Sequence, residues 1–437
     1  HALKKHATHM LQFKPGSDVA LLNSIMHVII EDDLFNDEYI KKQTSGFDDL
    51  RRHLKNYPPE IMEEQTGIDA DLIREVAHLY AKTSKGIIFW GMGVSQHVHG
   101  TDNARCLISL ALMTGNVGRR GSGLHPLRGQ NNVQGASDAG LIPMMYPDYQ
   151  LVEKDDKQNF FEKFWNTPLD DKKGLTVVEI MDAIHENTIK GMYILGENPA
   201  MSDPDLNHAR EALQILEHLV VQDIFLTETA TYADVIFPAS AWPEKNGTAT
   251  NTNRQVQMGR KALDAPGAAK EDWWITNELG KRMGLDWKYE HPREIYEEMS
   301  KTMPSLNNIT WDRLENENSV TYPSRSPTTP GDEIVFGDKF PNESGRGKFV
   351  PASVTSPNEV PDEEFEMILT TGRQLEHWHT GAMTRKASNL DAIEPEATVS
   401  ISPNEILKKN MKPGDKIRVS TRRGTVNIRV REDRAIP

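Results

Sequence analysis

Segments with helical periodicity alternate with short apolar runs along the first half of the chain. Residues 18–31 and 69–82 repeat apolar side chains every three or four positions, and Asp18 is placed to cap the first of them. This pattern predicts two amphipathic helices. The short apolar run 86–94 ends in glycines and predicts a buried strand, and residues 101–114 predict a helix capped by Thr101 or the aspartate after it. Strand, glycine turn and helix in this order form the unit of a doubly wound α/β domain.

The same alternation returns after a polar interruption. Three further segments have helical periodicity: 176–187, 203–216 and 272–284. Three short apolar runs predict strands: 191–196, 218–225 and 233–240. Helices between successive strands favour parallel pairing. The sequence therefore predicts a second parallel α/β domain.

The last third of the chain has a different pattern. Residues 304–362 are rich in Pro, Ser, Asn and Asp and only weakly periodic, which predicts a long connector or irregular insertion. From residue 365 the stretches FEMILTTGR and GDKIRVSTRRGTVNIRVRE alternate and predict strands of a β-barrel-like domain. The predicted fold class is α/β, with two doubly wound, mainly parallel α/β domains and an incomplete C-terminal β-barrel-like domain. The expected boundaries are 1–130 for part of the first α/β domain, 131–243 for the second, 244–360 for a helical and irregular connector, and 361–437 for the truncated C-terminal domain.

Charge and cysteine content exclude several classes of protein. With 50 basic and 64 acidic side chains the net charge is −14, which argues against nucleic acid and against anionic membrane surfaces. No run of about 18 apolar residues predicts a membrane span. The only cysteine, Cys106, lies in an apolar helical pattern and is interpreted as a small buried hydrophobic residue. One cysteine cannot form an intrachain disulfide, and the absence of such a bond fits a cytoplasmic location. One cysteine also cannot form a thiolate-only metal or iron–sulfur site.

Four turns follow predicted strands, at residues 91–96, 196–205, 222–229 and 370–381, and all but 222–229 contain glycine. Ligands of open α/β sheets bind beyond the carboxyl ends of the strands, where glycines let backbone N–H groups approach phosphates. Asp223 ends one predicted strand and is placed to accept hydrogen bonds from a ribose or guanine, although a turn or cap role is the alternative for any single aspartate.

Two His-x-His pairs raise the possibility of a metal site. His377 and His379 would share one face of a strand, and His97 and His99 have the same spacing. No third ligand is evident near either pair, so hydrogen bonding to a polar ligand or to backbone is favoured, and no metal ligand is assigned.

The stretch 121–140, GSGLHPLRGQNNVQGASDAG, combines glycines and four carboxamides with Arg128. A planar guanidinium can grip a small carboxylate with two hydrogen bonds, each contributing about 1.5–3 kcal/mol. The alternative is an arginine in a surface linker. The amides and glycines favour a backbone shaped around a polar ligand.

Several motifs together resemble the molybdopterin oxidoreductase superfamily, and within it the catalytic (alpha) subunit of molybdenum- or tungsten-dependent formate dehydrogenase. They are GMGVSQ, ALMTGNVGRRGSGLHPLRGQNNVQGASDAG, GENPAMSDPD, VVQDIF, ADVIFPAS and TTGRQLEHWHTGAMTR. The resemblance implies oxidation of formate to carbon dioxide at a Mo or W ion held by two molybdopterin guanine dinucleotides. It also implies an iron–sulfur cluster and a Cys or selenocysteine metal ligand, neither of which this chain matches. We therefore expect a fragment that is inactive alone.

The resemblance also assigns site residues and partners. Arg128 and Gln130 would lie beside formate. The residues implied to bind the dinucleotides and pterins are Lys14, Gly16, Asp18, Met92, Gln96, Gly196, Glu197, Asn198, Asp223, Thr227, Ser240, Asp272, Thr371, Arg373, Gln374, His377, His379 and Thr380. The implied partners are formate and an electron-transfer domain or subunit. Two alternatives stay open: another enzyme of the superfamily, such as a nitrate reductase, or a non-catalytic scaffold subunit with the same fold.

Overall fold

The computed structural model describes residues 2–436, which form two units. Each unit combines three separate stretches of chain. Unit 1 contains His1–Ala136, Ala249–Gln257 and Pro304–Val360, and unit 2 contains Ser137–Thr248, Met258–Met303 and Pro361–Pro437. This division is coarser than the four expected domains, whose boundaries stay a prediction.

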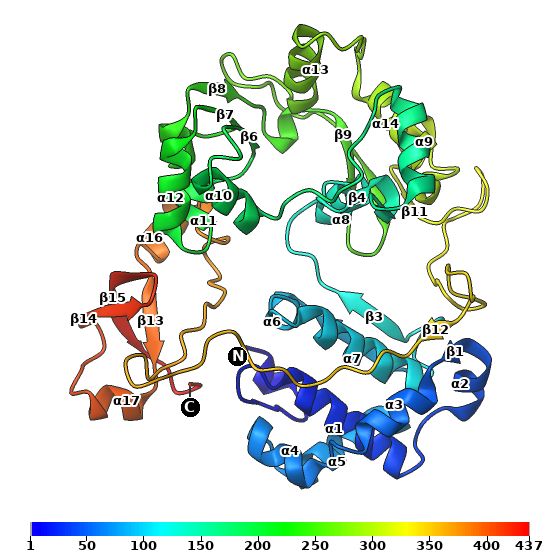
Figure 1. Cartoon of the computed structure of the whole chain (residues 1–437), viewed down its shortest axis with the longest axis vertical. Coiled ribbons are helices and arrows are strands. Elements are labelled where there is room, and N and C mark those ends of the chain that lie inside the picture. Colours follow the sequence, from blue (N-terminus) through cyan, green and yellow to red (C-terminus); the bar gives the residue numbers. More distant parts are fainter. Residues whose placement is uncertain (1, 437) are drawn as a thin grey trace. The chain divides into compact units, whose positions relative to one another are not determined.

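Unit 1 is mainly helical, and α1 is its central helix (Figure 1). Its helices are η1 (Ala2–His6), α1 (Asp18–Glu31), α2 (Asp37–Gln43), α3 (Phe47–Leu54), α4 (Pro59–Thr66), α5 (Ala70–Lys82), α6 (Met92–Ser95), α7 (Gly100–Met113), η5 (Pro304–Leu306) and α15 (Trp311–Glu317). Helix α1 packs against α3, α4, α5 and α7. The shared core includes Met26, Ile29, Leu50, Ile73 and Met113.

The strands of unit 1 are short. They are β1 (Thr44–Ser45), β2 (Ile87–Trp90), β3 (Gly123–Pro126), β11 (Ser319–Thr321) and β12 (Gly347–Lys348). Strand β2 pairs in parallel with β3, and α7 lies between them in the chain, as the predicted strand–helix unit requires. The prediction that β2 is buried is wrong within this unit. Ile87 and Phe89 are 47% and 58% exposed.

Both predicted helix caps are wrong. Helix α1 begins at Asp18, and the cap position belongs to Ser17, whose Oγ donates to the Lys14 carbonyl at 2.6 Å. Helix α7 begins at Gly100, one residue before the expected threonine cap. At α5, for which no cap was predicted, the Asp69 carboxylate accepts hydrogen bonds from the Asp71 and Leu72 backbone N–H groups.

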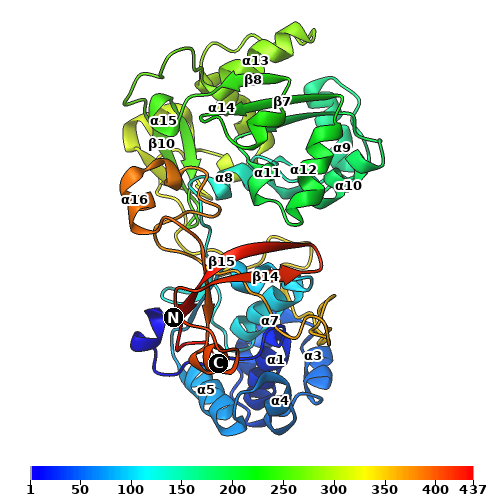
Figure 2. The same cartoon turned by 90° about the vertical axis from the view of Figure 1, so that its left-hand side faces the viewer.

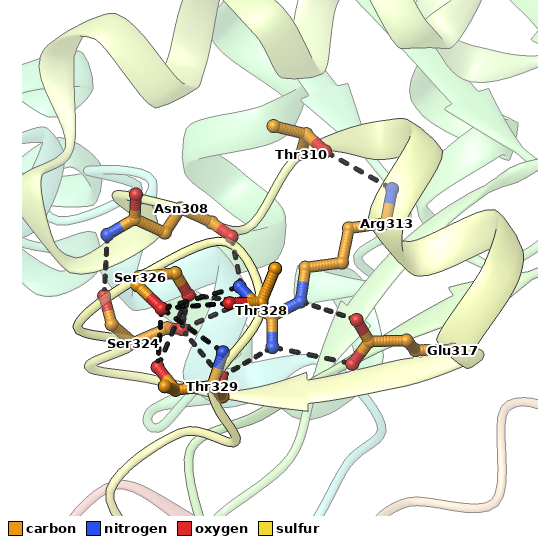
Figure 3. Close-up of polar contacts among 8 residues, drawn as sticks. All are labelled: Asn308, Thr310, Arg313, Glu317, Ser324, Ser326, Thr328 and Thr329. Carbon is orange, nitrogen blue, oxygen red and sulfur yellow. Dashed lines mark hydrogen bonds and ion pairs between the residues drawn. The ribbon is translucent and has the colours of Figure 1, made fainter.

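Residues 304–360 belong to unit 1 and carry helical and strand segments, while their description as a connector or irregular insertion stays a prediction. Trp311, Leu314 and Val320 are buried, and β11 pairs antiparallel with β10 (Gln255–Gly259), whose other neighbour is β9 (Gly247–Thr250). The buried guanidinium of Arg313 organises this region (Figure 3). It donates to Glu317 Oε1 at 2.8 Å, Ser324 Oγ at 2.8 Å and the Thr329 carbonyl at 2.7 Å. Polar side chains bonded to one buried cation give no apolar periodicity, so the sequence pattern did not reveal them.

Unit 2 contains a parallel sheet in the order β6-β7-β8, made of β6 (Gly191–Leu195), β7 (His218–Asp223) and β8 (Val235–Pro238). Helices α11 (Pro199–Ser202) and α12 (Leu206–Ile215) lie beside the sheet (Figures 1 and 2). Ala200 and Leu213 pack on Ile194, Leu219 and Val221. Helix α10 (Val177–His185) packs against α12. The predicted second parallel α/β domain is confirmed in this part of the chain.

The remaining helices of unit 2 flank this sheet in the sequence. They are η2 (Pro147–Tyr149), α9 (Asp155–Trp165), η3 (Thr229–Tyr232), η4 (Trp242–Glu244), α13 (Asp272–Arg282), α14 (Pro292–Thr302), η6 (Thr384–Lys386), α16 (Ser388–Ile393) and α17 (Pro403–Lys408). Strands β4 (Met145–Tyr146) and β5 (Gln150–Leu151) form a small antiparallel pair, and α8 (Val133–Asp138) crosses the boundary of the two units.

The C-terminal segment forms a three-stranded sheet in the order β13-β15-β14, from β13 (Thr398–Ile401), β14 (Lys416–Thr421) and β15 (Gly424–Glu432). The predicted hairpin of β14 and β15 is confirmed. Residues 361–436 contain no closed barrel, and the strand expected at 365–373 is absent from them. Met367, Ile368 and Leu369 are more than half exposed, since no described strand lies beside them. No helix among residues 2–436 is long and apolar enough to cross a membrane.

Candidate cofactor and substrate site

The loops that follow β6, β7 and β8 meet at one edge of the sheet in unit 2. Leu195 is paired with Gln222, and Asp223 with Pro238, so the carboxyl ends of the three strands are in register. Parallel strands present their carboxyl ends at the same edge, which is where ligands of open α/β sheets bind. The geometry therefore brings together the predicted residues between 196 and 240.

Asn198 ties the first of these loops to the second. Its buried Oδ1 accepts from the backbone N of Thr229 at 3.1 Å and from Thr229 Oγ1 at 2.7 Å, and its Nδ2 donates to Glu228 Oε2 at 2.8 Å. The bond from Asn198 lowers the pKa of Glu228, with smaller help from Lys386 and Arg210. Glu228 was not predicted. A glutamate directly after Thr227 gives no signal in the sequence until the fold places it against Asn198.

The flanking residues of this loop are solvent-facing. Gly196 has φ +67°, and a Cβ atom there would meet nothing within 4 Å, so the conformation rather than crowding requires glycine. Glu197 is exposed. Its charge adds to burial in raising the pKa of Asp203. The loop thus presents backbone and carboxylate groups to open space at the sheet edge.

Asp223 and Asp272 lie close together beyond β7. Burial is the main cause of the raised pKa of Asp223, and the charge of Asp272 contributes. Asp223 Oδ1 accepts from the Phe225 backbone N at 3.1 Å. Both oxygens of Asp272 are already engaged, with Gln222 Nε2 at 2.7 Å and with the ammonium of Lys245. Neither Gln222 nor Lys245 was assigned a role from the sequence: Gln222 lies in the VVQDIF motif beside the aspartate that was assigned, and Lys245 lies outside the motifs.

Ser240 and Thr227 complete the group at this edge. The Ser240 side chain is buried, and its Oγ has no hydrogen-bond partner among residues 2–436. Thr227 Oγ1 accepts from the Ala230 backbone N at 3.3 Å, so this residue shapes the turn before η3.

The predicted C-terminal residues occupy an irregular loop rather than a strand. The two ring nitrogens of His377 contact the Glu394 carbonyl at 2.7 Å and Thr384 Oγ1 at 3.3 Å. Hydrogen bonds to backbone and side-chain groups therefore hold this ring, which is the role that the sequence favoured over metal binding. The Arg373 guanidinium lies 4.9 Å from the centre of the Trp378 ring. Gln374 Nε2 is buried without a partner in the described chain. Thr371, His379 and Thr380 are exposed.

The predicted residues of unit 1 form a separate group around the start of α1. Lys14 donates its ammonium to the Glu64 carbonyl at 2.8 Å, and Gly16 turns the chain with φ +81°. Asp18 is buried, which raises its pKa, while nearby His97 opposes the shift. Met92 and Gln96, at the two ends of the short turn α6, are exposed.

Cys106 lies near this group and has the predicted role. It is 2% exposed, its Sγ lies 3.5 Å from Asn23 Oδ1, and burial raises its pKa to about 12. The thiol is therefore a buried neutral group and not a metal ligand or nucleophile.

The stretch 121–140 is shaped by its amides, but Arg128 and Gln130 are exposed in unit 1. The Arg128 backbone N donates to Thr252 Oγ1 at 3.1 Å. Asn132, with φ 63°, accepts the Thr250 backbone N at 2.9 Å. A Cβ on Gly135 would lie 2.1 Å from Asn132 Oδ1, so glycine is needed for this approach. The backbone is ordered by these bonds, while the Arg128 side chain lies on the surface of its unit.

A bound dinucleotide would provide hydrogen-bond partners for polar atoms that the protein leaves unsatisfied in unit 2. Ser240 Oγ and Gln374 Nε2 are buried without a described partner, and Asp223 keeps a carboxylate at the strand end. Gly196 leaves open space in a loop with positive φ. Buried polar groups are normally paired, so an acceptor or donor from a ligand suits these positions. The edge fits a polar nucleotide group. No group of three or more His, Cys, Asp or Glu suited to a metal ion occurs between residues 2 and 436.

A parallel α/β unit with polar loops at the carboxyl ends of its strands defines a nucleotide-binding class of protein. Two family models match this chain: "Molybdopterin oxidoreductase" over residues 2–282 and "Molydopterin dinucleotide binding domain" over residues 367–437. The chain belongs to the molybdopterin oxidoreductase family.

Curated relatives extend this similarity over nearly the whole chain. The F420-dependent formate dehydrogenase subunit alpha of Methanocaldococcus jannaschii is 43% identical over 433 residues, covering 98% of this chain and 64% of the relative. The F420-dependent formate dehydrogenase 2 subunit alpha of Methanococcus maripaludis is 41% identical over 434 residues, with 99% and 64% covered. The chain thus spans less than two-thirds of the length of these relatives. Acetylene hydratase from Pelobacter acetylenicus shares the fold, with a TM-score of 0.73 at 19% identity over 99% of this chain and 63% of that one.

Proposed function

We propose that this chain is part of the catalytic subunit of a formate dehydrogenase that oxidises formate to carbon dioxide. The observation that carries the proposal is the 43% identity to a formate dehydrogenase subunit alpha across 98% of the chain. Because that relative is longer, the activity belongs to the complete polypeptide, and the 437-residue chain alone is inactive. The iron–sulfur cluster, the Cys or selenocysteine ligand, the electron-transfer partner and the cytoplasmic location are parts of the same proposal.

The cofactor is two molybdopterin guanine dinucleotides with Mo or W, and the residues named in the sequence analysis are proposed to hold it. In unit 2, Asp223, Ser240 and the 196–198 loop bind one nucleotide, and Gln374 and Thr380 lie toward the pterins. In unit 1, Lys14, Gly16 and Asp18 bind the other nucleotide, and Met92 and Gln96 touch one of the two dinucleotides. When bound, the metal centre would supply the two-electron redox chemistry, and the residues named above would hold its dinucleotides.

The protein's own contribution is to bind and orient the substrate. Arg128 offers a planar pair of N–H donors that match both oxygens of formate, and Gln130 lies two residues away to orient it. The exposed position of Arg128 in its unit leaves the guanidinium accessible to a small anion. Holding the substrate in one orientation removes part of the entropic barrier to its oxidation.

The test is an assay of the complete polypeptide, purified without oxygen. We expect formate-dependent reduction of a viologen dye, no comparable nitrate reduction, and guanine and Mo or W in the purified protein. Nitrate reduction without formate oxidation would assign another reaction of the family. Protein free of guanine and metal would favour a scaffold subunit and contradict the proposal.

A further inference from the structure

An aromatic pocket lies within unit 2, bounded by α9, α13, α14 and the chain between them, which are labelled in Figure 1. The cavity measures about 350 Å³. Its walls include Phe164, Trp165, Trp273, Trp287 and Tyr289. None of these residues belongs to the cofactor or substrate groups described above. Such a concentration of aromatic rings around one small cavity suits a specific organic ligand.

The shape of α13 holds one of these rings in place. Trp273, Asn277 and Gly280 are spaced i, i+4 and i+7, so they share one face of the helix. A Cβ on Gly280 would come within 2.3 Å of the Trp287 ring, which means that glycine lets the indole lie directly on the helix. Asp272 lies one position away, where it bonds Gln222 and Lys245.

The polar groups of the pocket accept hydrogen bonds. Glu298 lies in the wall and accepts the phenolic hydrogen of Tyr289. Burial raises the pKa of Tyr289 to about 12, so the phenol keeps that hydrogen at neutral pH. Asn277 Nδ2 donates to the Tyr289 carbonyl at 3.0 Å, which fixes the amide orientation. Its buried Oδ1 then has no hydrogen-bond partner among residues 2–436.

The charged side chain among the described residues that line the pocket is acidic. No lysine, arginine or histidine is among the described residues that line it. Aromatic faces are the negative part of the ring quadrupole and attract cations. A neutral apolar ligand would further desolvate the Glu298 carboxylate, which accepts from Tyr289, without offering it another donor, whereas a cation would be stabilised by both the rings and the carboxylate.

From these contacts we propose that the pocket binds a small organic ammonium ion, with its apolar part between the indoles and its N–H groups directed to Glu298 and Asn277. This site is additional to the proposed formate chemistry and does not depend on it. A free primary amine fits the proposal, because the unpartnered amide oxygen and the carboxylate both require N–H donors.

Calorimetric titration of the full-length protein with benzylammonium chloride tests the proposal. We expect saturable binding with one site per chain, and binding about tenfold weaker for benzyl alcohol, which has the same ring without the charge. The Glu298→Gln variant keeps an acceptor for Tyr289 but loses the charge, and we expect it to weaken benzylammonium binding about tenfold. Its matched control is Glu297→Gln, an exposed neighbour on α14 that should bind as the native protein does.

Two outcomes would overturn the proposal. Equal binding of benzyl alcohol and benzylammonium by native protein would show an apolar pocket without cation recognition. Equal effects of the two glutamine variants would exclude a specific role for Glu298. Formate oxidation by the same samples is a separate measurement, so failure of one proposal does not affect the other.

Discussion

Asn198 and Thr229 are joined by two hydrogen bonds to a single oxygen: Asn198 Oδ1 accepts from the Thr229 backbone N at 3.1 Å and from its Oγ1 at 2.7 Å. Asn198 follows β6 and Thr229 begins η3, after β7, so one buried carboxamide connects the loops beyond two strands. The spacing of these loops, where we place a nucleotide, depends on that carboxamide.

Replacing Asn198 by alanine removes three hydrogen bonds and leaves the Thr229 N–H buried without a partner. We expect the free energy of unfolding to fall by about 2–3 kcal/mol, measured by urea denaturation. The control is Asn207→Ala, an exposed residue with one 3.4 Å contact to the Arg423 carbonyl. Its effect should stay within about 0.5 kcal/mol. Similar losses for both variants would contradict the role of Asn198 in joining the loops.

Substituting Asn for Asp223 should reduce the guanine content of the full-length protein, since the carboxylate is proposed to bind the nucleotide. Loss of a charge-assisted bond of about 1.5–3 kcal/mol predicts about tenfold or greater weakening of cofactor retention. Guanine is measured after acid release from purified protein. Glu211→Gln on the exposed side of α12 should leave the content unchanged. Native guanine content in the Asp223→Asn protein would exclude a role for this carboxylate.

Arg313 and Arg325 provide a matched test of buried and exposed arginines. Arg313 is 7% exposed and bonded to side chains and carbonyls of residues 308–329, whereas Arg325 pairs with Asp332 at 2.9 Å on the surface. We expect Arg313→Met to lower the free energy of unfolding by about 3 kcal/mol, because several acceptors lose their donor. The Arg325→Met change should cost less than about 1 kcal/mol. Denaturation curves that rank the two variants in the opposite order would refute this interpretation of the 304–332 region.

The Arg128→Lys change keeps the positive charge but loses the planar fork that matches a carboxylate. If Arg128 orients formate, kcat/KM for formate should fall by about 10- to 150-fold, corresponding to one charge-assisted bond of about 1.5–3 kcal/mol. Arg128→Ala should fall further, because the charge is also lost. Metal and guanine content should be unchanged in both. Full kcat/KM in the lysine variant with full cofactor would make Arg128 a structural loop residue.

Cys106 should resist alkylation in the folded chain. Its pKa is raised to about 12 by burial, so iodoacetamide at about pH 8 should modify it only after unfolding. Because the unfolded thiol ionises first, near its ordinary pKa of 9.0, this group's contribution to stability is complete below that pH and is lost as pH rises toward about 12. Mass spectrometry of native and urea-treated protein measures the reaction. Rapid alkylation of native protein would show that the thiol is accessible.

The sequence by itself determined the elements whose pattern is strong and local. Helices α1, α5, α7, α12 and α13 and strands β6, β7 and β8 were all predicted from periodicity, because one apolar face must be buried whatever the neighbours are. The α/β class followed from their alternation. The family was recognisable from motifs such as LRGQNNVQGASD, because several specific residues recur there in a fixed order.

Only the tertiary structure decided which distant residues act together. The sequence gives no sign that Glu228 meets Asn198, that Lys245 pairs with Asp272, or that Arg313 organises the polar segment after it. These contacts join polar side chains, which have no periodicity to detect. The strand expected at 365–373 did not form because a local pattern cannot show whether a partner strand is present. Alternation favours a strand, but a strand forms only where another strand lies beside it to satisfy its backbone hydrogen bonds.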